Sequence, residues 1–338
     1  MQKRILIIRQ DRIGDTVLAT ALPREIKRTW PRSRVTMLVR SYTRPIFENN
    51  PYVDEILTDD FVASERQASF WRMVGRLRRR RFTHALMLLP QARYNYMTFC
   101  AGIPWRIGHG IILFHALTFV RPVMTRKFRP GRSEAEYAMD LARAMGVRTR
   151  DVWSEIHLTD GERARSVANR DHWREGGRRV VGLHVTSGNS APNWTPAAWG
   201  ELVQRLAAET SLRVVVTDNI VPAEVAGVPG VLYPNAGVEL REALVNLAAL
   251  HLLVSASTGP MHLAAALQVP TLSLFCPLPA CAPALWGPVG NRAEFVLPAA
   301  AYCRDACPGD PKRCTYAGCA EVSPEAVAQL VLNSSGSS

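Results

Sequence analysis

Short apolar runs alternate with helix-like segments along the first half of the chain. The runs are rich in Ile, Leu and Val, are bounded by charged residues or proline, and span residues 4–9, 34–39 and 84–89. Such runs are typical of strands that are buried on both faces of a parallel sheet. Helical spacing of apolar residues is present at 20–30, between the first two runs. This alternation predicts a parallel β-α-β sheet for the first half.

The second half repeats the alternation. Strand-like runs span 179–185, 213–217, 252–256 and 271–275, and helix-like segments span 196–210, 240–250 and 259–268. Between the halves, residues 149–179 are charged and have poor apolar periodicity, which indicates a connecting segment with one helix near 160–174. We therefore predict an α/β protein with two doubly wound parallel sheets and two domains, residues 1–158 and 159–338.

The composition agrees with this plan. The chain has 338 residues, of which 47% are hydrophobic and 21% charged, and this describes a soluble globular protein too long for one ordinary core. The apolar run Ile5–Ile8 is followed at once by Arg9, Asp11 and Arg12, so the N-terminus does not resemble a signal peptide. The longest apolar stretches are shorter than the roughly 18 to 20 residues of a membrane-spanning helix. We expect a cytoplasmic protein without a transmembrane segment.

The net charge of +12, from 41 Lys and Arg against 29 Asp and Glu, favours an anionic partner. Two stretches are especially basic. One is the run 76–81, and the other, 105–132, combines Trp105, Phe114 and Phe119 with the basic residues Arg106, Arg121, Arg126, Lys127, Arg129 and Arg132. This combination suits peripheral contact with the inner face of the cytoplasmic membrane, although packing within the N-terminal domain explains the apolar residues equally well. Neither stretch carries the motif of a nucleic-acid reader, so we predict no nucleic-acid partner.

The first candidate site directly follows the first predicted strand. In an open parallel sheet, ligands bind at the carboxyl ends of the strands, and Arg9, Asp11, Arg12 and Asp15 lie there. Gly14 is expected to let the backbone turn into the next helix, and Asp15 is expected near the N-terminus of that helix. A helix cap is the alternative role for Asp15. A cap does not explain the three charged residues beside it.

A second candidate site follows the run 252–256. Ser257, Thr258 and Gly259 open a helix of small residues, whose free backbone N–H groups predict a diphosphate site. His262, on the first turn of this helix, is either a structural partner or a hydrogen-bond donor to phosphate.

A third candidate site follows the run 179–185 and consists of His184, Thr186, Ser187 and Gly188, for which an ordinary turn is the alternative. Neither a P-loop nor a G-x-G-x-x-G pattern occurs in the sequence. Their absence disfavours ATPases and dehydrogenases.

At these three stretches the chain resembles glycosyltransferase family 9, the heptosyltransferases that build the lipopolysaccharide core. The resemblance rests on "ILIIRQDRIGDTVLATALP", an H-x-x-S-G loop followed by a tryptophan, "STGPMHLAAAL" and "LWGPVG", in this order. It implies the GT-B fold, two Rossmann-like domains that face each other across a cleft, with the acceptor mostly in the N-terminal and the nucleotide-sugar in the C-terminal domain. It also implies inverting, metal-independent transfer of heptose from ADP-heptose to an anionic lipid-linked oligosaccharide, with no cofactor required.

By the same resemblance, Asp15 is the general base of the reaction. The acceptor-binding residues are Arg9, Arg12 and Gly14, and the donor-binding residues are His184, Thr186, Ser187, Gly188, Glu224, Ser257, Thr258, Gly259 and His262. Cationic side chains and the N-terminus of a helix would stabilise the negative charge of the departing diphosphate.

The chain departs from the family pattern in the donor region. Many relatives have an aspartate in place of Ser257 and a lysine near Asn193, and Asp218 competes with Glu224 for the match to a nucleotide-binding glutamate. A nucleotide-sugar-binding protein with an altered donor or lost catalysis is therefore the alternative function. Retention of Asp15 favours the enzyme.

Four of the seven cysteines, Cys303, Cys307, Cys314 and Cys319, fall in a polar segment with Pro and Gly. Their C-x3-C and C-x4-C spacings could chelate a structural zinc ion, although zinc ribbons use tighter C-x2-C pairs. Free thiols or disulfides are the alternative. We predict no catalytic metal and no catalytic role for these cysteines.

Overall fold

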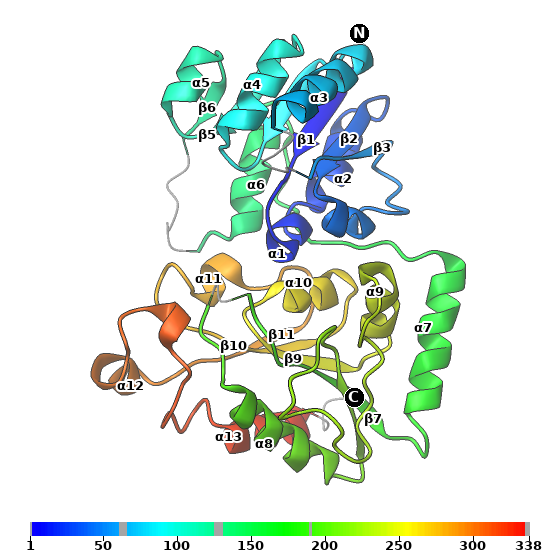
Figure 1. The fold of residues 1–338 in the computed structure, drawn as a ribbon, viewed down its shortest axis with the longest axis vertical. Coiled ribbons are helices and arrows are strands. Elements are labelled where there is room, and N and C mark those ends of the chain that lie inside the picture. Colours follow the sequence, from blue (N-terminus) through cyan, green and yellow to red (C-terminus); the bar gives the residue numbers. More distant parts are fainter. Residues whose placement is uncertain (1, 61–65, 125–130, 189–190, 335–338) are drawn as a thin grey trace. The chain divides into compact units, whose positions relative to one another are not determined.

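The computed structural model describes residues 2–60, 66–124, 131–188 and 191–334 (Figure 1). The chain divides into two compact units, Met1–His157 and Leu158–Ser338, called here the N-terminal unit and the C-terminal unit. Each unit is built around one parallel sheet. The alternation of strands and helices that the sequence predicts is therefore present in both halves.

In its described part, the N-terminal unit has a six-stranded parallel sheet with the order β3-β2-β1-β4-β5-β6. The strands are β1 (Arg4–Ile8), β2 (Arg34–Val39), β3 (Glu55–Thr58), β4 (His84–Met87), β5 (Trp105–His109) and β6 (Arg121–Val123). The predicted runs are confirmed as β1, β2 and β4. The sequence pattern missed β3, β5 and β6, because these strands are short or carry polar residues toward the edges of the sheet.

Helices cover both faces of this sheet. They are α1 (Ile13–Val17), α2 (Ala21–Thr29), the 3-10 helix η1 (Ser41–Ile46), α3 (Arg66–Arg80), α4 (Ala92–Cys100), α5 (Leu113–Leu117) and α6 (Glu134–Arg143). Leu6 and Ile8 of β1 pack in one apolar cluster with Leu77 of α3 and Met97 of α4. The alternate side chains of β1 are therefore turned to the opposite face, where α2 and α6 contact each other. The centre of the core is thus β1, and its carboxyl end leads directly into the first candidate site.

In the C-terminal unit, the described residues form a five-stranded parallel sheet with the order β11-β10-β9-β7-β8. The strands are β7 (Arg179–His184), β8 (Leu212–Val216), β9 (Leu252–Ala256), β10 (Thr271–Leu274) and β11 (Ala293–Val296). The four predicted runs are confirmed as β7 to β10. The edge strand β11 was missed because Glu294 and Phe295 leave it half exposed and without a long apolar run.

Four helices of the C-terminal unit, α7 to α10, confirm the predicted segments, whereas the helices after β10 were not predicted. The helices are α7 (Asp160–Trp173), α8 (Pro196–Ala207), α9 (Leu240–Ala248), α10 (Gly259–Ala266), α11 (Pro283–Trp286), α12 (Ala300–Asp305), the 3-10 helix η3 (Pro311–Arg313) and α13 (Pro324–Asn333). Local sequence explains where they begin. Thr159 caps α7 in a capping box with Glu162, and Thr195 caps α8 just before Pro196.

The two faces of this sheet differ in polarity. Val254 and Leu272 pack in the apolar cluster that includes Trp199 of α8 and Val327 of α13. Because side chains alternate along a strand, Ser255 and its neighbours in register point to the other face, which is covered by α9 and α10 (Figure 1). The helix α10, which carries the second candidate site, therefore lies over hydroxyl-bearing strands.

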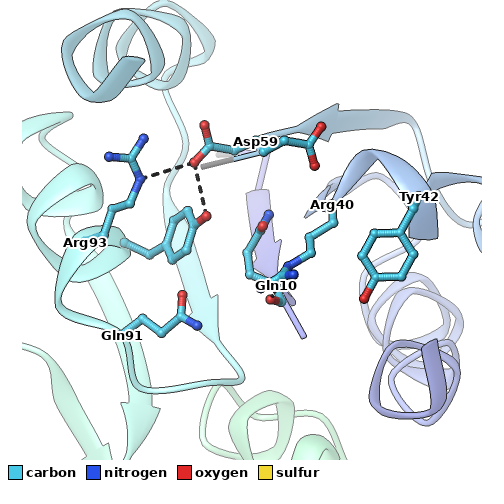
Figure 2. Close-up of a pocket in the computed structure, with 8 residues that line it drawn as sticks. Gln10, Arg40, Tyr42, Asp59, Gln91 and Arg93 are labelled. Atoms are coloured by element: carbon cyan, nitrogen blue, oxygen red, sulfur yellow. Dashed lines mark hydrogen bonds and ion pairs between the residues drawn. The ribbon is translucent and has the colours of Figure 1, made fainter. Parts of the chain in front are cut away.

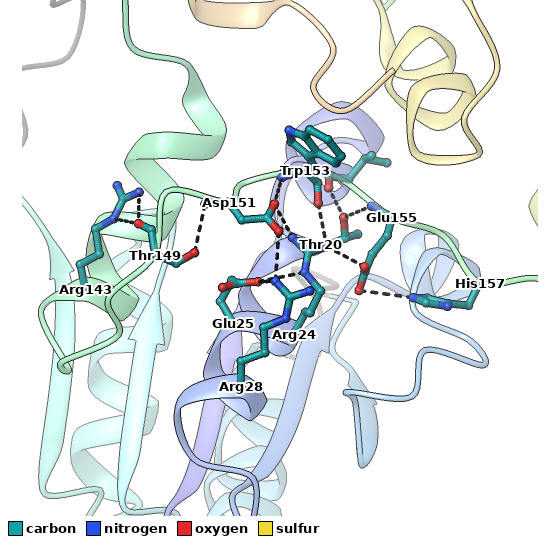
Figure 3. Close-up of polar contacts among 11 residues, drawn as sticks. Thr20, Arg24, Glu25, Arg28, Arg143, Thr149, Asp151, Trp153, Glu155 and His157 are labelled. Atoms are coloured by element: carbon teal, nitrogen blue, oxygen red, sulfur yellow. Dashed lines mark hydrogen bonds and ion pairs between the residues drawn. The ribbon is translucent and has the colours of Figure 1, made fainter. Parts of the chain in front are cut away.

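A polar network fixes the segment 149–157, which leads out of the N-terminal unit (Figure 3). The buried Arg24 of α2 donates hydrogen bonds to Glu155 (2.6 Å), Asp151 (2.8 Å) and the carbonyl oxygen of Trp153 (3.0 Å). Burial alone opposes ionisation of Glu155, but hydrogen bonds from His157 and Arg24 outweigh it and lower the pKa of this carboxyl. The predicted connecting segment is thus anchored to the helix that follows the first candidate site.

Residues 76–80 of the basic run form the C-terminal end of α3, Arg81 follows the helix, and the run is partly engaged within the unit. Arg80 forms an ion pair of 2.5 Å with Glu55, and Arg78 donates a hydrogen bond of 2.9 Å to the carbonyl oxygen of Cys100. These contacts bind the helix end to β3 and α4. The run is therefore less available to an external anion than the sequence suggests.

The second basic stretch, 105–132, contains β5, α5 and β6. Arg106 is buried and donates hydrogen bonds of 3.1 and 2.6 Å to the carbonyl oxygen of Thr118, and Arg132 forms an ion pair of 2.8 Å with Asp140. Arg126, Lys127 and Arg129 lie outside the described residues. No helix in the described ranges is both long enough and apolar enough to cross a membrane.

Candidate functional site

A buried arginine gathers three carboxylates at the carboxyl end of β1. The side chain of Arg9 is 2% exposed, and its Nη2 atom lies 2.8 Å from Asp15 Oδ1 and 3.5 Å from Glu134 Oε1. Its Nε atom lies 3.2 Å from Asp11 Oδ1. Arg9 is therefore occupied in holding carboxylates, so its predicted role in direct contact with an acceptor is not what this geometry favours. Glu134, the first residue of α6, was missed because it lies 125 positions from Arg9.

Asp15 lies in the first turn of α1, as predicted. The N-cap of α1 is Arg12, whose side chain makes no capping hydrogen bond, so the alternative of Asp15 as a cap is wrong. Gly14 lies inside α1 and does not make the turn that we expected of it. Arg9 holds Oδ1 of Asp15, whose side chain is 21% exposed, and no donor among the described residues contacts the other oxygen. That oxygen is free to accept a proton.

Asp11 shares the same arginine but has a different environment. Burial raises the pKa of Asp11 to about 6, the negative charges of Asp15 and Glu134 add to this shift, and Arg9 opposes it. Three carboxylates around one guanidinium carry excess negative charge. Asp11 therefore keeps its proton to a higher pH than an ordinary aspartate does.

A pocket of about 430 Å³ lies at the same edge of the sheet (Figure 2). It is lined by residues that follow β1, β2 and β3 or lie at the start of α4, namely Gln10, Arg40, Tyr42, Asp59, Asp60, Gln91, Arg93 and Tyr94. The hydroxyl of Tyr42 donates a hydrogen bond of 2.9 Å to the carbonyl oxygen of Asp11, which connects the pocket to the carboxylates around Arg9. We did not anticipate this pocket, because its residues are polar singletons that only the strand order brings together.

In the C-terminal unit, Asp218 organises the third candidate site. It is fully buried just after β8 and accepts hydrogen bonds from the backbone N–H groups of Val185 and Thr186 (both 2.9 Å) and from the Thr186 hydroxyl (2.6 Å). His184 Nε2 lies 3.5 Å from Asp218 Oδ1, and burial lowers the pKa of His184. The carboxylate of Asp218 is thus engaged in holding this loop, which favours a positioning role over contact with a nucleotide.

The second candidate site has hydrogen-bonding groups that are not satisfied within the described structure. Thr258 is the N-cap of α10, but its hydroxyl makes no capping bond and is buried without a hydrogen-bond partner. Gly259 is the first residue of the helix, and Ser257 precedes the cap. His262 Nδ1 is also buried without a partner, and burial lowers the pKa of His262 to about 4, so this ring is neutral near pH 7. Backbone N–H groups and a free hydroxyl are the groups that bind a diphosphate.

Two serines add to this polar region. Ser255 of β9 and Ser273 of β10 are paired in register, and both hydroxyls are buried without a hydrogen-bond partner among the described residues. They lie on the face of the sheet that α10 covers. A buried hydroxyl without a hydrogen-bond partner costs free energy. Apolar side chains at these two positions would pack against α10 without that cost, so packing alone does not explain the serines.

The remaining residues that were predicted to bind the nucleotide-sugar lie in two places. Ser187 and Gly188 lie in the loop after β7, next to Thr186. Glu224 is exposed, and its carbonyl oxygen is so close to Gly200 of α8 that a Cβ atom there would lie 2.8 Å away. The backbone of Glu224 thus lies beside α8.

Asn193, near which the expected family pattern has a lysine, has a structural role. Its Nδ2 atom donates a hydrogen bond of 2.9 Å to the carbonyl oxygen of Val185, and its Oδ1 atom accepts one of 3.0 Å from Trp199 Nε1. The amide therefore ties the loop after β7 to α8. It adds no positive charge to the donor region.

All seven cysteines are free thiols. Cys314 and Cys319 are buried in the apolar cluster of the C-terminal unit, whereas Cys303 and Cys307 are half-buried. Across the described ranges, no group of three or more His, Cys, Asp or Glu side chains is placed to hold a metal ion. The structure thus assembles no zinc site from these four cysteines, and packing accounts for two of them.

Comparisons with known proteins cover both units. A sequence model of glycosyltransferase family 9 (heptosyltransferase) matches residues 70–307. Lipopolysaccharide heptosyltransferase 2 of Escherichia coli K12 is 24% identical over 312 residues, which cover 87% of each chain. The solved family 9 glycosyltransferase of Veillonella parvula has a TM-score of 0.79 at 18% identity, over 98% of this chain and 96% of that one. For the ADP-heptose lps heptosyltransferase II of E. coli, the TM-score is 0.74 at 19% identity, over 98% of each chain.

Proposed function

Because the chain belongs to glycosyltransferase family 9, the heptosyltransferase family, we propose that it transfers heptose from ADP-heptose to the lipopolysaccharide core or a related surface glycan. The donor and the acceptor class are those named for the E. coli protein of the same fold. The observation that carries the proposal is the partly exposed carboxylate of Asp15, held by Arg9 with one oxygen free. A nucleotide-sugar-binding protein without catalysis has no need of such a group.

The proposed reaction inverts the anomeric centre in one displacement. The acceptor hydroxyl attacks the anomeric carbon of the heptose and forms the new C–O bond, while the bond to the diphosphate of ADP breaks. Asp15 takes the proton of the hydroxyl as general base, which makes the oxygen a better nucleophile during the attack. Arg9 keeps the carboxylate in place through a charge-assisted hydrogen bond of 2.8 Å.

The diphosphate of the donor would bind at the N-terminus of α10. There the helix dipole, the free N–H groups and the Thr258 hydroxyl stabilise the negative charge that grows on the leaving group. We propose that this suffices without a divalent metal and without a cofactor. The loop of His184, Thr186, Ser187 and Gly188, held by Asp218, lies at the end of a neighbouring strand and is the second donor-binding element of the proposal.

We assign the acceptor to the N-terminal unit and the donor to the C-terminal unit. Since the acceptor is a lipid-linked oligosaccharide, we further propose a cytoplasmic enzyme in peripheral contact with the inner membrane.

The test compares two carboxylate variants. In steady-state transfer of heptose from ADP-heptose to a lipopolysaccharide core acceptor, Asp15→Asn should lower turnover by about 10²-fold or more, because the proton acceptor is lost. The affinity for ADP should not change. Asp11→Asn, which alters a neighbouring carboxylate on the same arginine, should lower turnover less than tenfold.

Near-normal turnover of Asp15→Asn, or a larger loss in Asp11→Asn, would overturn the assignment of the base. Wild-type protein that binds ADP-heptose but transfers nothing to the core acceptor would instead support the binding-protein alternative.

A further inference from the structure

Another pocket, with a volume of about 450 Å³, lies at the amino edge of the C-terminal sheet. Most of its lining residues directly precede or begin the parallel strands of this sheet. The second and third candidate sites follow the carboxyl ends of β9 and β7, at the opposite edge. His251 and Ser257 flank β9, and the extended chain between them spans roughly 20 Å. The pocket is therefore separate from the proposed donor site.

Positive charge predominates in this pocket. The charged residues that line it, apart from the histidine, are three arginines and one glutamate, namely Arg174, Arg179, Arg292 and Glu294. Arg292 Nη2 lies 3.4 Å from Glu294 Oε1, and both side chains are about half exposed. Arg174 is exposed, and in the described ranges no carboxylate lies within ion-pair distance of it. One carboxylate thus faces three guanidinium groups.

Arg179 is held in place by the C-terminal end of α13. Its Nη1 atom donates hydrogen bonds to the carbonyl oxygen of Val331 (3.1 Å) and to the Ser334 hydroxyl (3.0 Å). Burial lowers the pKa of Arg179, the positive charge of Arg292 adds to this shift, and Glu294 opposes it. The two guanidinium groups are therefore close enough to repel each other, and an anion bound between them would offset both charges.

His251 adds an uncharged hydrogen-bond donor to the lining. Its Nδ1 atom accepts a hydrogen bond of 3.1 Å from the backbone N–H group of Val180, so Nε2 carries the hydrogen of the neutral ring. Burial lowers the pKa of His251, and the nearby arginines add to this shift, so the ring is neutral near pH 7. An imidazole N–H group beside guanidinium groups is suited to the oxygen atoms of a phosphate.

The charge and size of the pocket narrow the class of ligand. A phosphate monoester carries a charge of about −1.5 to −2 near pH 7, which is close to the balance of three arginines against one glutamate. Guanidinium groups bind phosphate oxygens in planar, bidentate pairs. A volume of about 450 Å³ suits one small molecule.

We propose that this pocket binds a small soluble phosphate monoester, with Arg174, Arg179 and Arg292 around the phosphate group and His251 donating to one of its oxygens. The site is additional to the proposed transferase site and does not depend on that function. It places a phosphate ligand at the edge of the C-terminal sheet that the diphosphate of a donor does not use.

The closing experiment uses glucose 6-phosphate as the probe and glucose as its neutral counterpart. Both are titrated into the full chain at pH 7.5 without any nucleotide, and binding is followed by ligand-observed NMR. Glucose 6-phosphate should bind at least tenfold more tightly than glucose. The double variant Arg174→Gln and Arg292→Gln should lower its affinity by about tenfold or more, because two charge-assisted contacts are lost.

Two control variants locate the binding. Arg205→Gln removes an exposed arginine of α8 that pairs with Glu201 outside the pocket, and it should keep the wild-type affinity. Thr258→Val alters the opposite edge of the sheet and should keep it as well. Because Arg174 and Arg292 are exposed, the double variant should fold, and thermal unfolding checks this.

Equal binding of the two sugars, or a double variant with wild-type affinity for glucose 6-phosphate, would overturn the proposal. A loss of affinity in Thr258→Val alone would place the phosphate on α10 and would equally overturn it. Since neither probe is a donor, absence of transfer from ADP-heptose would count against the proposed function and not against this pocket.

Discussion

Asp11 is the single residue whose chemistry differs most from what its position in the sequence suggests. It lies on the chain between Gln10 of the pocket and Arg12, the N-cap of α1. Burial raises its pKa to about 6, and Asp15 and Glu134 add to that shift against the opposing charge of Arg9. A raised pKa in the folded state means that ionised Asp11 destabilises the fold.

The pH dependence of stability follows from this shift. Well below pH 3.8, Asp11 is protonated in both folded and unfolded chains and has no effect on stability. Between pH 4 and about 6 the unfolded carboxyl ionises while the folded one keeps its proton, so wild-type stability falls as the pH rises. Asp11→Asn cannot ionise, and from pH 4 to pH 8 its stability should rise by about 2 to 3 kcal/mol relative to wild type, from a shift of the pKa from 3.8 to about 6.

Urea unfolding of both proteins at pH 4, 6 and 8 measures this difference in the free energy of unfolding. Titrating groups that the substitution does not affect contribute equally to both proteins, so their contributions cancel. A stability difference that stays constant over this range would contradict the raised pKa. Asp11 and Asp15 lie four positions apart and share Arg9, and the side chain of Asp11 is 14% exposed while that of Asp15 is 21% exposed.

At the scale of elements, α10 is a helix whose N-terminus lacks the usual internal cap. Thr195, the N-cap of α8, accepts a hydrogen bond of 3.3 Å from the N–H group of Ala198, whereas Thr258 at the same position of α10 makes no such bond. A capping hydroxyl stabilises its helix by about 1 kcal/mol. The free hydroxyl of Thr258 instead remains available for a ligand.

This contrast gives a matched pair of variants. Thr258→Val should weaken ADP binding by about 1 to 2 kcal/mol, because one hydrogen bond to the diphosphate is lost, and should change stability little. Thr195→Val should lower stability by about 1 kcal/mol and leave ADP affinity unchanged. Calorimetry with ADP, UDP and GDP, first in EDTA and then in magnesium, measures the affinities, and thermal unfolding measures the stabilities.

We expect ADP to bind best and its affinity to survive EDTA. Binding that requires magnesium, or a Thr258→Val protein with wild-type affinity, would show that the diphosphate does not lie on α10. The lack of a lysine near Asn193 leads us to expect weaker binding than in relatives that have one.

At the scale of the whole molecule, exposed apolar side chains are concentrated in one segment of the N-terminal unit. Ile111, Leu113, Phe119 and Met124 are each at least 70% exposed, and Leu117 of α5 is 57% exposed. Phe119 also adopts a left-handed backbone with a φ of 52°, which is uncommon for a bulky residue. Within a chain of net charge +12, such a patch suits an anionic lipid surface.

Co-sedimentation with vesicles tests this surface. The protein should bind vesicles of phosphatidylcholine with phosphatidylglycerol and bind those of phosphatidylcholine alone much less. The double variant Leu113→Ser and Phe119→Ser should lower binding by about tenfold or more, since each large side chain is worth roughly 1.5 to 3 kcal/mol when fully buried. Ile220→Ser, which removes an exposed side chain of the C-terminal unit, is the control. Undiminished binding of the double variant would contradict the proposed membrane contact.

The sequence by itself determined the parallel α/β plan, because strands buried on both faces and amphipathic helices leave periodic patterns that are local. The runs that became β1, β2, β4 and β7 to β10, and the helices α2 and α7 to α10, were readable for that reason. Motif order also indicated the family. Candidate residues placed directly after a strand, such as Asp15 and Thr258, were found because the carboxyl ends of parallel strands are where ligands bind.

Only the tertiary structure decided what surrounds these residues. Glu134 reaches Arg9 from α6, Asp218 is engaged by the loop after β7, and the pocket around Gln10 and Arg40 joins the ends of three strands, β1 to β3, to the start of α4. All these contacts join positions far apart in the chain, and no local pattern encodes them. Ionisation likewise depends on burial and on neighbouring charges, so the raised pKa of Asp11 arises only when the chain is folded.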